Sequence, residues 1–261
     1  MDLGLEGRLV VITGASKGIG LACASVFAAE GARVVGISRD NHRLHEAQRQ
    51  LASLGLSMAV QGADLTDSVA AKLVMECIEN DHGPIDVLVN CAGAARRRPV
   101  DELDAEALHA AMQAKYFTYM HAIEPAIRRM AARGRGSIVN IIGQGGRQPS
   151  PVHIGGGAAN AALMLATVGY ATAYASQGVR VNAINPGITR TERMQEGLAA
   201  SARATGRTQE VLLREQTAEI PLGRVAEPEE IARVAVFLAS PMASYVTGVI
   251  VPMDGGKAGV V

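Results

Sequence analysis

Short apolar runs rich in β-branched residues alternate with longer helical patterns along this chain. The first run spans 9–12, and a helical pattern over 19–29 follows it. Further runs predict strands at 33–38, 58–61, 87–90, 137–142, 179–184 and 249–251. Helical patterns predict helices between them, at 41–54, 69–80, 104–132, 157–175 and 228–238.

This alternation predicts an α/β fold, a Rossmann-type doubly wound parallel sheet with helices on both faces. No linker-like stretch divides the chain, so we expect a single domain over 1–261. Residues 191–219 are polar, alanine-rich and weakly patterned. Ligands of such sheets bind outside the carboxyl ends of the strands, so the loops after the first, fourth, fifth and sixth strands are where chemistry is expected.

The composition agrees with a buried parallel sheet. Hydrophobic residues make up 48% of the 261 residues, aromatic residues only 3%, and tryptophan is absent. The core is therefore expected to be aliphatic, as a sheet covered on both faces by helices requires.

Charge and cysteine usage exclude several classes of partner. The formal net charge is zero, which gives no electrostatic reason to expect nucleic acid or an anionic membrane. The run 96–98 is three arginines, for which a solvated loop is favoured over a phosphate-binding patch. The three cysteines show no metal spacing and no paired framework, so we predict no metal and a reducing cytoplasm. We find no secretory signal and no run of 18 apolar residues.

A glycine-rich turn lies between the first strand and the first helix. It reads Gly14-Ala15-Ser16-Lys17-Gly18-Ile19-Gly20. Glycines allow a tight turn and close approach of the backbone, and the helix start offers unpaired N–H groups to a pyrophosphate. The strand–turn–helix context makes dinucleotide binding a better interpretation than a plain tight turn.

The end of the second strand bears on the choice of nucleotide. An acidic residue there usually accepts hydrogen bonds from the ribose hydroxyls of NAD, but this strand ends in Ser38 followed by Arg39. Together with Lys17, these residues suit a 2′-phosphate and favour NADP(H) over NAD(H). The alternative is that Arg39 is a surface charge next to Asp40.

Two polar residues follow the third and fourth strands. Asp64 is placed to accept a hydrogen bond from an adenine amino group, and Asn90 precedes Cys91-Ala92-Gly93. The Asn90 amide is placed to join loops beside the cofactor. Each residue alone is compatible with an ordinary turn.

These motifs resemble those of the short-chain dehydrogenase/reductase family over nearly the whole chain. The matching segments are Thr13–Gly20 for TGxxxGxG, Asp64-Leu65 for the adenine-site pair, Asn90–Gly93 for NNAG, Arg180–Gly187 for the sixth-strand signature, Thr191 for PGxxxT, and Pro221–Arg224 and Asp254–Gly256 for the C-terminal signatures. The resemblance implies a seven-stranded sheet and a homo-oligomer, usually a tetramer. It also implies cofactor contacts from Pro186, Gly187, Ile188, Thr191, Ala92 and Gly93, and a substrate loop over 191–219.

The family's catalytic Ser, Tyr, Lys and Asn do not appear at the corresponding positions. Gly143 falls on the Ser, Gly156 on the Tyr, Asn160 on the Lys and Lys115 on the Asn. The only tyrosines between 143 and 175 are Tyr170 and Tyr174, and neither has a lysine four residues later. General acid catalysis contributes about 10²–10⁴-fold, so the usual mechanism would be crippled without substitutes.

Two substitutes are suggested by the same alignment. Lys115 and Asn160 retain an ammonium and an amide with their places exchanged, which suggests that Lys115 supplies positive charge near the nicotinamide ribose. An equally good interpretation is that Lys115 extends to solvent. His153 is nominated as proton donor because an imidazole titrates near neutral pH, although lone loop histidines are usually polar surface. Gln144 and Ser150 are candidates for substrate contacts.

Three functions remain open from the sequence. The first is an NADP-dependent oxidoreductase acting on a small-molecule carbonyl or alcohol with a rearranged active site. The second is a non-redox enzyme, a lyase or hydrolase, on the same fold. The third is a nucleotide-binding sensor or partner subunit without catalysis. The alanine- and glycine-rich helix at 157–175 is suited to pack against a second copy of the chain.

Overall fold

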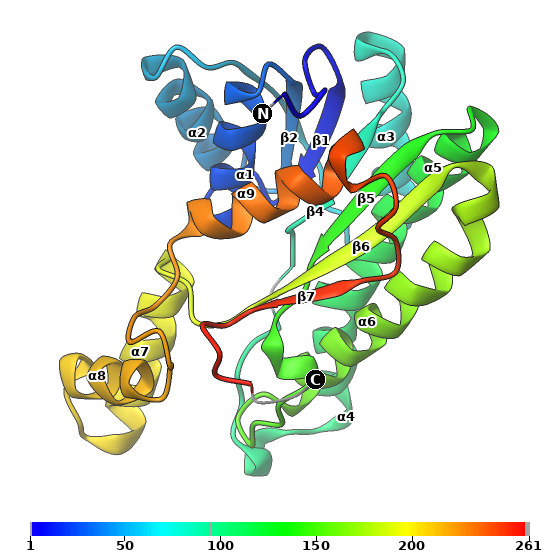
Figure 1. The fold of residues 1–261 in the computed structure, drawn as a ribbon. Coiled ribbons are helices and arrows are strands. Elements are labelled where there is room, and N and C mark those ends of the chain that lie inside the picture. Colours follow the sequence, from blue (N-terminus) through cyan, green and yellow to red (C-terminus); the bar gives the residue numbers. More distant parts are fainter. Residues whose placement is uncertain (1, 94, 259–261) are drawn as a thin grey trace.

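The computed structural model describes residues 2–93 and 95–258. Seven parallel strands form one sheet in the order β3-β2-β1-β4-β5-β6-β7 (Figure 1). The strands are β1 Leu9–Thr13, β2 Arg33–Ser38, β3 Met58–Gly62, β4 Val87–Asn90, β5 Gly136–Ile141, β6 Val179–Pro186 and β7 Ile250–Met253. This confirms the predicted fold class, with strand ends that differ from the expected ones by one or two residues.

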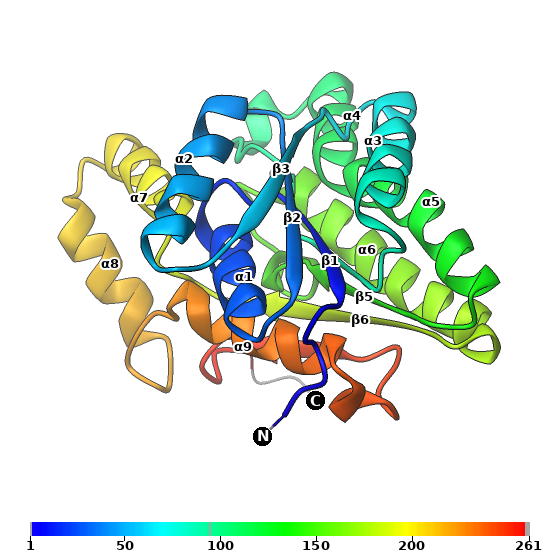
Figure 2. The ribbon, with the colours of Figure 1, turned by 90° about the horizontal axis from the view of Figure 1, so that it is seen from above.

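Helices cover both faces of the sheet (Figure 2). They are α1 Gly18–Ala29, α2 Asn41–Ser53, α3 Ser68–His82, α4 Ala105–Met112, α5 Thr118–Ala132, α6 Ile154–Tyr174, α7 Glu192–Thr205, α8 Gln209–Ala218 and α9 Pro228–Ala239. Side chains alternate across a strand, so Val10 and Ile12 enter the core under α1, α2 and α9. Leu9 and Val11 enter the opposite core, under α3, α5 and α6.

The strand order reverses beside β1. β1 pairs with β2 on one side and with β4 on the other, so the loops after β1 and β4 leave in opposite directions. A crevice outside the carboxyl ends of the strands at such a point is the usual ligand site of this architecture. The glycine-rich turn after β1 lies at this edge, beside the loops after β4, β5 and β6.

The helix expected over 104–132 is divided. A π-helical turn, Gln113–Phe117, separates α4 from α5. The Thr118 hydroxyl donates to the carbonyls of Gln113 and Ala114, at 3.1 and 3.3 Å, and so bonds back into this turn. Insertions of this kind are frequent at functional sites, and this one contains Lys115.

α6 begins three residues earlier than expected, with His153 as its N-cap, so Gly155, Gly156 and Gly157 lie inside the helix. By length and composition, residues 154–177 would suffice to cross a membrane. However, the face that contains Leu163 and Ala171 is buried in the core against the sheet. The apolar character of α6 is therefore explained by packing on the sheet.

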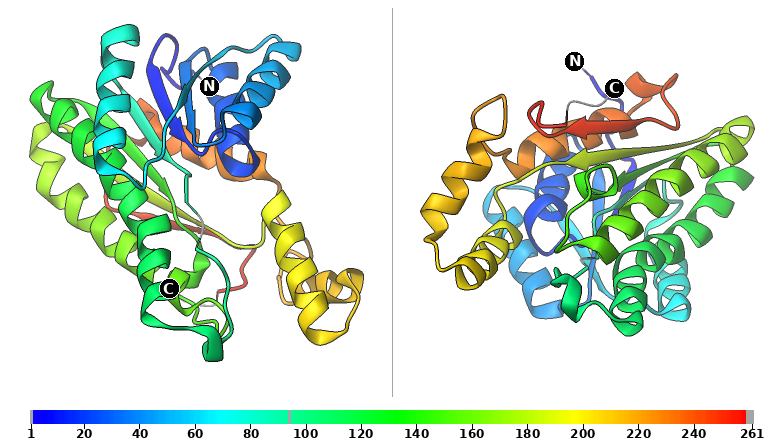
Figure 3. Two further views of the ribbon diagram at one scale, coloured as in Figure 1. Left: turned by 180° about the vertical axis from the view of Figure 1, so that it is seen from behind. Right: turned by 90° about the horizontal axis from the view of Figure 1, so that it is seen from below.

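The weakly patterned segment at 191–219 forms two helices, α7 and α8, which project from the body of the molecule (Figure 3). Each begins with a threonine cap: the Thr191 hydroxyl accepts from Met194 N, and the Thr208 hydroxyl accepts from Val211 N. Such caps stabilise helix starts, which explains why regular helices form despite a weak hydrophobic pattern.

Candidate functional site

The turn after β1 has three positions at which the structure favours glycine. A Cβ on Gly14 would lie 2.9 Å from Ala92 N, and a Cβ on Gly20 would lie 2.2 Å from Gly14 O. Gly18 has a φ of +56°, and a Cβ there would lie 3.3 Å from the Thr191 methyl group. No side chain caps the first turn of α1. The free N–H groups and the absence of side-chain bulk fit a pyrophosphate.

Cationic side chains lie around the end of β2. Lys17 Nζ donates to Glu192 Oε2 at 2.9 Å, and Arg43 Nη1 donates to the same oxygen at 3.0 Å. Arg39 Nη1 lies 3.8 Å from Asp64 Oδ2. Arg43 was not predicted from the sequence as part of this site. Its position in the first turn of the helix after β2 could have indicated it.

Ser38 itself lies against the glycine-rich turn. Its hydroxyl donates to Ser16 Oγ at 3.1 Å. Asp64 turns its Oδ1 toward the N–H and hydroxyl of Thr66, at 3.0 and 2.8 Å. The next residue, Leu65, is buried in the core. Asp64 Oδ2 accepts no short hydrogen bond from the described residues, so it remains available to a ligand.

Asn90 and Thr13 join the loops at the switch point. The Thr13 hydroxyl accepts from the N–H groups of Cys91 and Ala92, both at 3.1 Å. The Asn90 amide donates to Asn140 Oδ1 at 3.0 Å, which ties β4 to β5. Gly93, with a φ of +96°, lies so close to the π-helical turn that a Cβ would be 2.2 Å from Ala114 O.

The loop after β6 closes the same edge. Pro186 ends β6 beside β7, and Gly187 N donates to Met253 O at 2.8 Å. The carbonyl of Ile188 accepts from Ala226 N at 3.0 Å. Thr191 follows as the cap of α7 and lies beside Gly18. These residues therefore lie next to the glycine-rich turn.

Lys115 extends into the protein. Its ammonium donates to Tyr119 OH at 2.8 Å and to the Ile141 carbonyl at 3.1 Å, and the residue is only 8% exposed. Burial, together with the charge of Arg193, lowers the pKa of Lys115 to about 7, and Cys91 acts in the opposite direction. The interpretation in which Lys115 extends to solvent is therefore wrong.

Tyr119 holds this lysine in place and was missed in the sequence. It is fully buried, and its hydroxyl donates to the Ile141 carbonyl at 2.5 Å. The available signal was the spacing Lys-x-x-x-Tyr at 115–119, which places both side chains on one helix face. The family pattern has the opposite order, with a tyrosine four residues before a lysine, on the following helix.

The imidazole of His153 fills the space beside Gly156. An ideal Cβ on Gly156 would lie 2.0 Å from His153 Cε1, and one on Gly145 would lie 3.1 Å from Cδ2. Burial lowers the pKa of His153 to about 4, with further contributions from Arg97, Arg193 and Lys115. The ring is therefore neutral at pH 7. Its Nδ1 is buried and has no partner among the described residues.

Substituting Gly156 by alanine tests this packing. Gly156→Ala should displace the His153 ring and lower the free energy of unfolding by about 1–3 kcal/mol. In a His153→Ala background, Gly156→Ala should raise the free energy of unfolding by about 0.5–1 kcal/mol, because alanine is favoured over glycine in a helix. Denaturant unfolding of the four proteins measures both effects. Equal effects of Gly156→Ala in the two backgrounds would show that the ring does not occupy this space.

The other residues after β5 bond to one another. Asn160 Nδ2 lies 3.5 Å from Gly143 O, and Gly143 N donates to Asn185 Oδ1 at 3.3 Å. Gln144 Nε2 donates to Asp254 Oδ2 at 2.6 Å, so Gln144 is turned toward the end of β7. Ser150 accepts from His153 N through its main-chain carbonyl. Asn160 and Gly143 thus lie together with Lys115 and His153 near the end of β5.

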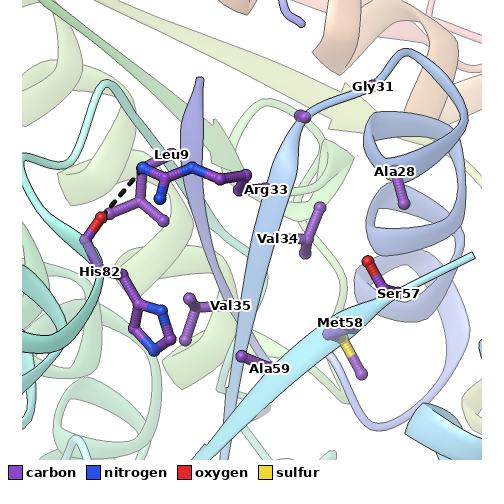
Figure 4. Close-up of a pocket in the computed structure, with 11 residues that line it drawn as sticks. Leu9, Ala28, Gly31, Arg33, Val34, Val35, Ser57, Met58, Ala59 and His82 are labelled. Atoms are coloured by element: carbon purple, nitrogen blue, oxygen red, sulfur yellow. Dashed lines mark hydrogen bonds between the residues drawn. The ribbon is translucent and has the colours of Figure 1, made fainter. Parts of the chain in front are cut away.

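A separate pocket lies at the opposite edge of the sheet (Figure 4). It is lined by the first residues of three strands, Leu9, Arg33 and Met58, and by His82, whose carbonyl accepts from Arg33 Nη2 at 2.9 Å. These are the amino ends of the strands, whereas ligands of such sheets bind at the carboxyl ends. We therefore place the candidate site at the glycine-rich edge.

Sequence comparison identifies relatives that match over nearly the whole chain. The profile of the enoyl-(acyl carrier protein) reductase family matches residues 14–258. The chain is 33% identical to the 3-oxoacyl-(acyl-carrier-protein) reductase FabG of Thermotoga maritima, over 97% of this chain and 98% of that protein. It is 37% identical to an A-factor type gamma-butyrolactone 1′-reductase of Streptomyces virginiae, over 97% and 96%.

Solved structures with the same fold include enzymes bound to either nicotinamide nucleotide. The L-sorbose reductase of Gluconobacter frateurii, complexed with NADPH and L-sorbose, superposes with a TM-score of 0.93 at 32% identity, and each chain is covered completely. An NAD⁺-bound xylitol dehydrogenase superposes with a TM-score of 0.91 at 25% identity, over 97% of this chain and 99% of that one.

Proposed function

Because this chain belongs to the short-chain dehydrogenase/reductase family of oxidoreductases, we propose that it interconverts a carbonyl and an alcohol with NADP(H) through a rearranged active site. The observation that carries this proposal is the buried ammonium of Lys115, held by Tyr119 and the Ile141 carbonyl at the end of β5. Its pKa of about 7 suits proton transfer at neutral pH.

The rearrangement concerns the four positions at which the family has its catalytic residues. In this proposal Gly143 and Gly156 replace the serine and tyrosine and provide no side chain for chemistry. Lys115 and Asn160 replace the asparagine and lysine. The ammonium thus reaches the end of β5 from the π-helical turn rather than from α6.

The residues of the glycine-rich edge fit a dinucleotide. The uncapped start of α1, with Gly14, Gly18 and Gly20, would hold the pyrophosphate. Lys17, Arg39 and Arg43 would hold the 2′-phosphate. Lys17 and Arg43 would then give up their ion pairs with Glu192 and bind the phosphate instead. Asp64, Asn160 and the residues at 186–191 would complete the site, and bound NADPH supplies the hydride.

Lys115 handles the proton in this mechanism. During reduction its ammonium donates a proton to the carbonyl oxygen as that oxygen gains negative charge, and the product is the alcohol. Burial stabilises the neutral amine that remains, and a proton from solvent restores the ammonium. During oxidation the neutral amine accepts the hydroxyl proton. Tyr119 acts through Lys115 as a positioning residue, since its hydroxyl is bonded to the Ile141 carbonyl.

The role of proton donor therefore moves from His153, which the sequence suggested, to Lys115. A group with a pKa of about 4 holds almost no proton to give at pH 7. As a neutral imidazole, His153 can still donate or accept one hydrogen bond with a substrate oxygen. We assign it to substrate positioning.

The preference for NADP rests on this chain's own residues, because the fold is known with either nucleotide. We expect Ser38→Asp to weaken NADP⁺ binding by about 10- to 100-fold and to strengthen NAD⁺ binding, because a carboxylate repels the 2′-phosphate and accepts hydrogen bonds from ribose hydroxyls. Calorimetry with both nucleotides measures this. Ser57→Asp, an exposed site at the opposite edge of the sheet, is the control. A native protein that binds NAD⁺ more tightly would overturn the preference.

The proposed activity is tested by following the absorbance of NADPH with a panel of carbonyl compounds. Saturable NADPH binding with turnover of at least one carbonyl supports it. Binding without turnover over the whole panel favours a sensor or partner subunit, and conversion of a substrate without change in NADPH favours a lyase or hydrolase. The absence of saturable binding of either nucleotide would overturn all three functions.

We also propose that the chain forms a homo-oligomer and acts in the cytoplasm. The outer face of α6 exposes Leu165 and Val168 among small residues, which is a surface suited to a second copy. Sedimentation should therefore give a mass of at least two chains, and Leu165→Glu should lower it. A native mass of one chain of 27.2 kDa would contradict the proposal. The cytoplasmic location is supported by Cys23, Cys77 and Cys91, which are unpaired.

A further inference from the structure

One carboxylate joins three helix starts at the glycine-rich edge. Glu192 lies in the first turn of α7, and its Oε2 accepts from Lys17 Nζ at 2.9 Å and from Arg43 Nη1 at 3.0 Å. Lys17 is the residue before α1, and Arg43 lies in the first turn of α2. The start of α7 is therefore fastened to the starts of α1 and α2.

Neighbouring residues hold α7 in the same place. Thr191, the cap of α7, lies beside Gly18, where a Cβ would be 3.3 Å from the Thr191 methyl group. One helical turn after Glu192, the Oε1 of Glu196 lies 3.8 Å from Lys17 Nζ. Beyond this contact, α7 and α8 project from the body of the molecule (Figure 3). The projecting segment is thus tied at its start to residues that we propose hold the 2′-phosphate.

Each cation proposed for the 2′-phosphate already faces a carboxylate. Besides the contacts of Glu192, Arg43 Nε lies 3.7 Å from Asp40 Oδ2, and Arg39 Nη1 lies 3.8 Å from Asp64 Oδ2. Asp40 is held in place as the cap of α2, and Asp64 by its bonds to the next turn after β3. Glu192 makes the shorter contacts and belongs to the projecting segment, so it is the acid that an incoming phosphate displaces.

The ion pairs of Glu192 are open to solvent, which makes them easy to exchange. The side chains of Lys17, Arg43 and Glu192 are 43%, 46% and 59% exposed. Exposed ion pairs contribute little to stability, because water screens them and long side chains lose rotamer freedom. A phosphate group offers more negative charge and more acceptor oxygens than a carboxylate. Hydrogen bonds from Lys17 and Arg43 keep the pKa of Glu192 below its usual range, so this competitor is ionised at neutral pH.

We propose that Glu192 competes with the 2′-phosphate for Lys17 and Arg43, so that binding of NADP(H) detaches the start of α7 from α1 and α2, whereas binding of NAD(H) leaves it attached. This inference rests on the proposed function, because it needs a nucleotide at the glycine-rich edge. NAD(H) has only a hydroxyl at the position of the 2′-phosphate and so brings no charge that displaces the carboxylate. Glu192 therefore lowers the affinity for NADP(H) and makes the position of α7 depend on which nucleotide is bound.

Calorimetric binding of NADP⁺ and NAD⁺ to Glu192→Gln, at constant ionic strength, tests the competition. Glutamine keeps the shape of the side chain without its charge. We therefore expect NADP⁺ to bind about 3- to 10-fold more tightly, and the affinity for NAD⁺ to change by less than about 2-fold. Glu210→Gln, the same change in the first turn of α8, should alter either affinity by less than about 2-fold.

A double-mutant cycle separates direct competition from a general effect of charge. In a protein that carries Lys17→Met and Arg43→Met, Glu192→Gln should no longer tighten NADP⁺ binding, because the donors for which the two anions compete are gone. A long-range effect of the lost negative charge would persist in that background. Tightening of the same size in both backgrounds would therefore contradict the inference.

A carbodiimide crosslink reports the position of α7 itself. This reagent joins a lysine amine to a carboxylate in direct contact through an amide bond, and mass spectrometry identifies the joined peptides. We expect the Lys17–Glu192 crosslink in the free protein and with saturating NAD⁺, and at least about 5-fold less of it with saturating NADP⁺. The Lys257–Glu219 pair, with Nζ and Oε2 2.6 Å apart, is the internal control, and its crosslink should not depend on the nucleotide.

The sign of the effect on affinity decides between two roles of Glu192. Weaker NADP⁺ binding by Glu192→Gln would show that the carboxylate positions Lys17 and Arg43 for the phosphate, and the inference would be wrong. Equal tightening of both nucleotides, or a crosslink that NADP⁺ leaves unchanged, would also overturn it. These results leave the proposed function intact. If the native protein bound neither nucleotide, the proposed function and this inference would fail together.

Discussion

Replacing Lys115 by methionine is expected to lower kcat/KM for carbonyl reduction by about 10²–10⁴-fold, the usual contribution of a general acid. Methionine fills much of the same volume but has no proton to donate. Affinity for NADP⁺ should change little, because the glycine-rich turn that fits the phosphates is formed by other residues. Steady-state rates of NADPH oxidation and calorimetric binding measure the two effects separately.

The role of Lys115 as proton donor also predicts how the rates of reduction and oxidation change with pH. Reduction needs the protonated amine, so kcat/KM should fall as pH rises through about 7, and the rate of alcohol oxidation should rise over the same range. Tyr119 accepts from the Lys115 ammonium, the charges of Arg193 and Cys91 act on the pKa of Lys115, and Lys115 in turn lowers the pKa of His153. Of these, His153 has a pKa of about 4 and stays neutral throughout this range.

Lys115→Arg is the informative control. Arginine keeps the positive charge but does not release its proton near neutral pH, so Lys115→Arg should lose turnover about as severely as Lys115→Met. Tyr119→Phe should keep most of the turnover and shift the pH profile, as a positioning residue would. A Lys115→Met enzyme with native turnover would end the assignment of Lys115, and an unshifted profile would end that of Tyr119.

Lys115→Met is also expected to make the protein more stable. The pKa of Lys115 falls from 10.5 to about 7 on folding. Because the folded-state pKa is lower, the folded protein binds a proton less readily than the unfolded chain. The resulting loss of stability is absent above about pH 10.5, grows as pH falls, and is complete below about pH 7.

The size of this effect follows from the shift. Each pKa unit corresponds to about 1.4 kcal/mol, so charging Lys115 costs a few kcal/mol, against about 1–2 kcal/mol for its hydrogen bonds. At pH 6 the variant should therefore unfold several degrees above the native protein, and the difference should shrink toward pH 10. Lys72→Met, at an exposed site on α3, should show no such dependence. A Lys115→Met protein that is less stable at pH 6 would contradict the pKa of about 7.

Much of the fold was determined by the local sequence. The short apolar runs rich in β-branched residues specified the strands, and the glycine-rich turn between β1 and α1 indicated the edge of the sheet at which we propose a nucleotide site. Glycine at 14 and 20 is required by contacts of less than 3 Å, which no other residue type would satisfy. The sequence alone also shows that positions 143, 156 and 160 have no serine, tyrosine or lysine.

Only the tertiary structure decided the surroundings of the residues that we propose in their place. Lys115 comes from the π-helical turn and His153 from the start of α6, and no spacing along the chain indicates that both lie near the end of β5. Their protonation depends on burial and on one another's charges, which do not exist until the elements pack. The imidazole that titrates near neutral pH in an isolated peptide is therefore neutral here, while the ammonium that would otherwise stay charged acquires a pKa near 7.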